Sequence, residues 1–444
     1  MRGEHGAARN AYAKLFDLLR EIGGASGVWL DLDVDLREAR ARYCRCVYEQ
    51  AEEKARVREV VSAMEVEAKG RLFDDGPDDY PLLRDLLDAQ TGDLQGFAAF
   101  LPAWEKALAA KGFAGGRLAE LRLEAAFMRG GLAAVALLAR EWKEKQPTGY
   151  LIWLKRLGEA GEWPMVREAA REALGNLAAG EAREAAAGFL VEAGQHLKDD
   201  ATLLSGKRER FFSMPRAGNL LTLLAEAGRQ QVRERELAAA IHLLTGQKKG
   251  NEFTDHSLPV KALLMAGRLD EALARAGKAK AVGWSYDSSA GVALTAVLHL
   301  LTGGKPDCPL IQELMREYAG QGRYYFDDSG PGEEKEASFH EEITMGLGLI
   351  APQAADLTRY HAWARKIGEA RVNHIVSNKH RNAYDRAAKV LGALAETLVA
   401  TGEKSAAEHL LRDYYQVRYN RYAAFRKEVK EVVSSSPALK WVRL

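Results

Sequence analysis

The sequence has few cysteines, few prolines, no long apolar run and almost no net charge. Its 444 residues include three cysteines and 12 prolines, and the formal net charge is +1. So few cysteines exclude a disulfide framework and fit a reducing cytosol. No run reaches the roughly 18 apolar residues of a membrane-spanning helix, and the N-terminus lacks the apolar core of a signal peptide. We therefore expect a cytoplasmic protein whose overall charge identifies no partner.

Helix-forming residues dominate what is present. Ala, Leu, Glu and Arg are abundant, 47% of the residues are hydrophobic, and alternating β-branched patterns are almost absent. A single compact core rarely serves more than about 250–300 residues, whereas stacked helical repeats have no such limit because each packs only on its neighbours. Length and composition therefore favour an all-α chain built from repeats.

The clearest repeat unit is the stretch 263–280. A helix is predicted to end at Gly267, because glycine enters the left-handed conformation at low cost. A second helix follows, with Leu269, Ala272, Ala276 and Ala279 on one face. Comparable glycines recur elsewhere, namely Gly92, Gly130, Gly161, Gly194, Gly228 and Gly402. Two successive steps of this series are 33 and 34 residues and the others vary from 31 upward, so the repeat is degenerate.

This pattern of glycine, a large apolar residue and small alanines resembles the tetratricopeptide repeat. The resemblance implies an antiparallel helix-pair solenoid. On this basis we divide the chain into N-terminal helices at 1–75, tetratricopeptide-like repeats at 76–320, a loop at 321–337 and a last helical region at 338–444. The loop is predicted because Gly, Pro and acidic residues gather there.

The N-terminal segment is predicted to hold an amphipathic helix at 8–23 and a long charged helix at 36–70. In the first helix, the side chains expected to face inward are those of Leu15, Leu18, Leu19 and Ile22. Between the helices, Asp31, Asp33 and Asp35 alternate with apolar residues. The sequence lacks the glycine and the final acid of a calcium loop, so we expect Asp35 to cap the following helix.

The last segment differs from the rest in charge. Residues 360–444 contain 16 Lys and Arg against 8 Asp and Glu, a net charge of +8, which leaves −7 for the remainder. Within 412–427, aromatic residues interleave with basic ones, a combination that can pair with phosphates and stack on bases. The alternative, which we favour, is a basic helical C-terminal cap with the rings in its core. The residues proposed for specific contact are Arg418, Tyr419, Arg421, Tyr422, Arg426 and Lys427.

The C-terminal run 371–429 also contains a basic segment followed by an A-Y-x-x-A-A helix, in His380, Arg381, Ala383, Tyr384, Ala387 and Ala388. These residues, with the stretches 150–174 and 211–229, resemble the helical region that follows SWIM zinc fingers in a group of bacterial proteins. The resemblance implies a bacterial, cytoplasmic solenoid that works with a separately encoded partner. The zinc finger itself is absent, because Cys44-x-Cys46 has no C-x-H pair after it. We therefore expect no zinc and no cofactor.

No catalytic motif emerges from the sequence. It contains no phosphate-binding P-loop and no G-x-S-x-G elbow. His340 opens a sequence like H-E-x-x-H, but Thr344 stands where the second ligand must be. His374 and His380 would lie on different faces of a continuous helix. The remaining cluster of titratable residues comprises His374, His380, His409 and Asp385. We expect no enzyme and no metal site.

The favoured function is a non-enzymatic scaffold or adaptor that binds other proteins in a cytoplasmic bacterial complex. The alternative is a factor that binds the phosphate backbone of DNA or RNA through the basic C-terminal helices. A third hypothesis is a regulatory subunit whose acidic part masks its basic end until a partner arrives. No membrane partner is expected.

Overall fold

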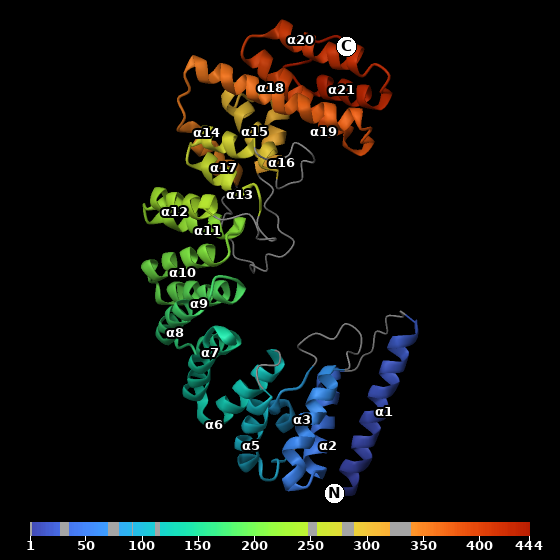
Figure 1. The fold of residues 1–444 in the computed structure, drawn as a ribbon, viewed down its shortest axis with the longest axis vertical. Coiled ribbons are helices and arrows are strands. Elements are labelled where there is room, and N and C mark those ends of the chain that lie inside the picture. The colour runs from blue at the N-terminus through green and yellow to red at the C-terminus, as the bar shows by residue number, and fades with distance from the viewer. Residues whose placement is uncertain are drawn as a thin grey trace. The chain divides into compact units, whose positions relative to one another are not determined.

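The computed structural model describes residues 2–26, 35–69, 80–90, 92–111, 116–246, 255–277, 288–319 and 339–444. Throughout these ranges the chain forms helices and turns and no strand, so the all-α prediction is confirmed (Figure 1). The chain divides into two compact units, Met1–Asp199 and Asp200–Leu444, and each is described by itself. The predicted loop 321–337 lies outside the described residues, as do Asp31 and Asp33.

The first unit contains nine α-helices within its described ranges. They are α1 (Arg2–Ser26), α2 (Leu36–Gln50), α3 (Glu53–Lys69), α4 (Leu83–Asp88), α5 (Phe97–Ala110), α6 (Gly116–Trp142), α7 (Thr148–Glu159), α8 (Trp163–Asn176) and α9 (Glu181–Leu197). Asp35 caps α2 as predicted, because its side chain accepts a hydrogen bond of 2.9 Å from the backbone N–H of Glu38.

Two predictions for this unit are wrong. The helix expected over 36–70 is broken at Ala51, whose extended backbone (φ −65°, ψ 137°) separates α2 from α3 and lets them pack on each other. In α1, Leu19 is buried and Leu15 is partly buried, as predicted, but Leu18 is 55% exposed and Phe16 is buried in its place. The side chain of Ile22 lies outside the described part of the chain.

The second unit continues with helices α10 to α21. They are α10 (Asp200–Ser213), α11 (Ala217–Arg229), α12 (Arg233–Gly246), α13 (Leu258–Met265), α14 (Leu269–Ala276), α15 (Ser289–Thr302), α16 (Pro309–Ala319), α17 (Phe339–Gly348), α18 (Ala354–Ser377), α19 (Tyr384–Ala400), α20 (Lys404–Arg412) and α21 (Ala423–Ser435). One apolar core runs through this unit from Phe211 to Val442. None of the helices in the described ranges, in either unit, is both long and apolar enough to cross a membrane.

One type of turn ends helix after helix. The N–H of a left-handed residue bonds to the carbonyl three residues earlier, and the next N–H bonds to the carbonyl five residues before it. This is the Schellman arrangement, which satisfies carbonyls that the helix end leaves free. It follows α7, α9, α11, α13, α15, α18 and α19, with the left-handed residues Gly161, Lys198, Gln231, Gly267, Gly303, Lys379 and Gly402.

The turn at 263–280 follows the prediction closely. Helix α13 ends at Met265, Gly267 is left-handed with φ 69°, and α14 begins at Leu269. Leu269, Ala272 and Ala276 are all buried, whereas Ala279 lies outside the described residues.

Three other glycines of the series, Gly130, Gly194 and Gly228, do not occupy the turn after a helix as predicted. Gly194 and Gly228 lie inside α9 and α11, and Lys198 and Gln231 take the left-handed positions that follow these helices. In α6 the kink falls at Gly131 (φ 63°, ψ −154°), where two helical stretches join. The glycine spacing is therefore an imperfect record of the turns.

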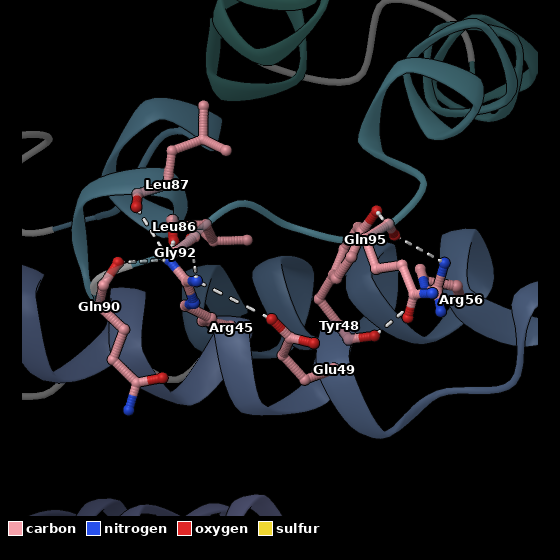
Figure 2. Close-up of polar contacts among 9 residues, drawn as sticks. All are labelled: Arg45, Tyr48, Glu49, Arg56, Leu86, Leu87, Gln90, Gly92 and Gln95. Carbon is pink, nitrogen blue, oxygen red and sulfur yellow. Dashed lines mark hydrogen bonds and ion pairs between the residues drawn. The ribbon is translucent and has the colours of Figure 1, made fainter. Parts of the chain in front are cut away.

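Buried charged side chains cap the ends of helices that lie far from them in the sequence. Arg45 of α2 is 3% exposed and donates hydrogen bonds to four backbone carbonyls at the C-terminal end of α4 and just beyond it (Figure 2). The acceptors are Leu86 at 3.1 Å, Leu87 at 2.8 Å, Gln90 at 2.9 Å and Gly92 at 2.6 Å. A guanidinium suits this place because it offers five N–H donors and its charge opposes the negative end of the helix.

Buried glutamates do the same at helix N-termini. Glu124 of α6 accepts hydrogen bonds from the first backbone N–H groups of α4, at Leu83 (2.6 Å) and Arg84 (3.0 Å). Glu396 of α19 is fully buried and accepts from Leu310 and Ile311 at the start of α16. Each carboxylate satisfies two N–H groups that have no partner inside their own helix.

Candidate basic interface at the C-terminal helices

The segment 412–427 comprises the end of α20, the π-helical turn Asp413–Arg418 and the start of α21. Its rings point into the core: Tyr414 and Phe425 are fully buried, and Tyr419 is 9% exposed. Tyr419 meets Tyr422 and Phe425 edge-on, with centroids 5.4 and 5.7 Å apart, and its hydroxyl donates to Asn373 Oδ1 over 2.9 Å. The aromatic residues therefore join α18 and α21 to the turn between α20 and α21.

Three of the proposed basic contact residues are engaged within the protein. Arg418 Nε lies 2.6 Å from Asp413, and its guanidinium stacks 4.8 Å above the centroid of Tyr414. Lys427 Nζ is 3.6 Å from Glu431.

The third engaged residue is Arg426, which lies 4.3 Å over the ring centroid of Tyr415 and donates to the Asn420 carbonyl. Burial alone would raise the pKa of Tyr415, but the neighbouring Lys430 and Arg426 lower it. Of the six predicted contact residues, Arg418, Arg421 and Lys427 are exposed, Tyr422 and Arg426 are half-buried, and Tyr419 is buried. The three exposed residues are all basic, whereas the ring of Tyr419 belongs to the core.

A second group of basic side chains gathers where α18 gives way to α19. Helix α18 ends at Ser377, Lys379 turns the chain with φ 58°, and a short 3-10 turn, Arg381–Ala383, leads into α19. This turn forms an open depression of about 540 Å³ lined by Lys379, His380, Arg381, Asn382, Ala383 and Arg386, which we call the basic depression.

The charges of the basic depression are not neutralised by ion pairs. Within the described ranges, no acidic side chain comes within 4 Å of the charged groups of Lys379, Arg381 or Arg386. The one acidic residue in the same stretch is Asp385, whose charge acts on Lys389 together with Glu313. The three cations are exposed, and no described acidic side chain serves them as a close counter-charge.

The positive potential of this region extends inward. Arg371 of α18 is 8% exposed; its burial lowers the pKa of its guanidinium, and the charge of Arg386 lowers it further. Burial raises the pKa of the Tyr384 hydroxyl, and the positive charge of Arg381 partly offsets this increase. The charge of Arg386, in the first turn of α19, therefore acts on Arg371 of α18, and the charge of Arg381 acts on Tyr384.

The two histidines at the end of α18 lie together, contrary to the expectation for a continuous helix. Because the helix ends and Lys379 reverses the chain, the rings of His374 and His380 come to 5.8 Å between centroids. His374 Nδ1 also lies 3.2 Å from Asn378 Nδ2. No three His, Cys, Asp or Glu side chains gather as a metal site anywhere in the described ranges.

The three cysteines lie in the interior of the protein. Cys44, Cys46 and Cys308 are all buried, and none of the three is in a disulfide. Burial raises the pKa of Cys308 to about 11. A thiol with so high a pKa is protonated at neutral pH and is a poor nucleophile.

Sequence reasoning identified His380 through a family resemblance and as a member of a cluster of titratable residues, and identified Arg381 through the resemblance alone. It did not single out Lys379 and Arg386. The available signal was the polar run Asn378 to Asn382, which interrupts two apolar helical patterns and carries three basic or histidine side chains. The chain matches no family model and no curated protein.

Proposed function

We propose that this chain is a tetratricopeptide-like helical-repeat scaffold that binds another protein and has no enzymatic role of its own. The observation that carries the proposal is the repeated Schellman turn that ends seven helices, followed in most cases directly by the next helix. Repetition of one supersecondary unit is typical of solenoids, whose exposed helix faces bind partners along the stack.

Pairs of helices within each unit support this assignment. Helices α7 and α8 pack together across the turn at Gly161, as do α11 and α12 across Gln231 and α13 and α14 across Gly267. Small side chains are buried in α8, where Ala169, Ala170 and Ala173 are all at most 3% exposed. We place the scaffold in a bacterial cytoplasmic complex, as the resemblance to SWIM-associated helical regions implies.

Affinity capture tests the proposal. The full chain, immobilised through its N-terminus, is incubated with lysate of its native host at about 150 mM salt, and the control is the same column carrying the unfolded chain. We expect at least one protein in near-stoichiometric amount that the control does not retain. If chemical crosslinking also recovers only proteins shared with the control, the scaffold proposal is wrong.

A second function is favoured by one specific observation, the unneutralised cations Lys379, Arg381 and Arg386 together with exposed Arg421. Such a group can hold phosphates of DNA or RNA, with an affinity that falls steeply as salt increases. Deletion of residues 404–444 would be a poor test, because Leu411, Tyr414 and Phe425 belong to the core. Neutralisation of surface cations leaves that core intact and is the appropriate change.

A further inference from the structure

We propose that the basic depression formed by Lys379, Arg381 and Arg386 is the docking site for an acidic segment of the partner protein, rich in Asp or Glu. This inference rests on the proposed scaffold function and identifies the chemistry of its partner. The partner's carboxylates would replace the counter-charges that the described acidic side chains do not supply.

The charges favour an anionic partner. The three cations line one open depression, and the charge of Arg386 also acts on the buried guanidinium of Arg371 in α18. Like charges held together repel one another and retain their water. An arriving anion relieves this repulsion, whereas a neutral or basic partner would gain nothing from the site.

The size of the site favours carboxylates on a peptide. Among the described residues, the depression is lined by residues 379–383 and 386, and its volume of about 540 Å³ leaves room for a few anionic groups. An extended peptide places alternate side chains on one face about 7 Å apart, a spacing that lets neighbouring carboxylates reach different cations. The guanidinium groups of Arg381 and Arg386 can bind carboxylates in the bidentate manner that arginine favours.

The aromatic residues argue against single-stranded nucleic acid. Proteins that bind single strands combine a basic groove with rings on which bases stack. Tyr384 and Tyr419 are 4% and 9% exposed, and the hydroxyl of Tyr419 is bonded to Asn373, so these two rings offer no stacking face. The more accessible rings are half-buried Tyr422 and exposed His380, and they form no row of rings on which successive bases could stack. A duplex would need a longer row of cations than one chain reversal provides.

Fluorescence anisotropy with defined probes tests the proposal. The probes are a labelled eight-residue glutamate peptide, a lysine-free neutral peptide of equal length and a twelve-base-pair DNA duplex, at low and physiological salt. The test variant of the full chain is K379Q/R381Q/R386Q. The control variant K366Q/K404Q/K440Q also removes three positive charges, but from exposed positions of the same unit that lie outside the depression. Circular dichroism establishes that both variants remain helical.

We expect the wild-type chain to bind the glutamate peptide at low salt and to prefer it to the neutral peptide and to the duplex. The test variant should bind about tenfold more weakly, because each exposed charge pair contributes modestly and three are removed. The control variant should lose less than about twofold.

Three results would overturn the proposal. Equal losses in the two variants would mean diffuse attraction to the net charge of the C-terminal region. Tighter binding to the duplex, lost in the test variant, would assign the depression to nucleic acid. No binding to the glutamate peptide at low salt would also refute it. If affinity capture still recovered a partner in that last case, the scaffold function would stand and only the acidic-segment proposal would fall.

Discussion

Substitution of Arg45 by methionine should destabilise the first unit strongly. Methionine keeps much of the apolar stem of arginine but removes four hydrogen bonds of 2.6–3.1 Å to Leu86, Leu87, Gln90 and Gly92 (Figure 2). Helix α4 has only six residues, so few hydrogen bonds within the helix remain to hold it when the bonds to Arg45 are removed.

The magnitude follows from the carbonyls left behind. A buried polar group without its partner costs about 1–3 kcal/mol, and hydrogen bonds to charged donors are at the upper end of the range. The carbonyl of Leu86 is buried and the other three are partly buried, so water can compensate for some of them. We expect the unfolding free energy to fall by about 3–5 kcal/mol for R45M, and by about half as much for R45K, because a lysine ammonium has three donors.

Urea denaturation followed by tryptophan fluorescence measures this effect, since Trp104, Trp142 and Trp153 are buried in the same unit. The control is R56M. Arg56 also donates to backbone carbonyls, but over 3.1–3.4 Å, and it is only half-buried. That change should cost about 1 kcal/mol. Equal losses for R45M and R56M would refute the reasoning, because they would show that water satisfies the carbonyls of α4 as well as arginine does.

Three further predictions concern the second unit. Burial raises the pKa of Glu396 to about 7, so its folded form binds a proton more readily than its unfolded form. The unfolding free energy should therefore fall by on the order of 2–3 kcal/mol as pH rises from about 4.5 to about 7, and E396Q should flatten that dependence in urea titrations at several pH values. A Cβ on Gly346 would lie 2.2 Å from the Leu264 carbonyl oxygen; G346A should force α17 away from α13 and cost about 2–4 kcal/mol, and a loss under about 1 kcal/mol would show that the crossing adapts. Gln231 has φ 59°, so Q231G should raise stability by about 0.5–1 kcal/mol by relieving left-handed strain, and a lower melting temperature would contradict this.

The fold class was predictable because local patterns decide it. Leu269, Ala272 and Ala276 recur at helical spacing after Gly267, and each occupies the predicted buried face. The N-cap at Asp35 was predictable for the same reason, since a side chain bonds to a backbone group three residues away. Neither feature depends on any distant part of the chain.

The site was only partly predictable. A mixture of aromatic and basic residues over 412–427 indicated an interface. Burial of the rings is a consequence of packing against α18 and α21, whereas the ion pairs of Arg418 with Asp413 and of Lys427 with Glu431 join residues close together in the chain. The basic depression depends on where α18 ends. Lys379 adopts a left-handed turn that its residue type does not favour, so no local pattern signalled that His380 folds back towards His374.

The sequence by itself determined the helical class, some of the helix ends and the concentration of positive charge near the C-terminus, because these depend on residues close together in the chain. The tertiary structure alone decided which charges are used inside the protein and which remain free. Arg45, Glu124 and Glu396 are ordinary helical residues in the sequence, yet each is buried against the end of a helix at least 40 residues away. The desolvation of a charge, and the partner that compensates for it, are set by that distant backbone and not by neighbouring residues.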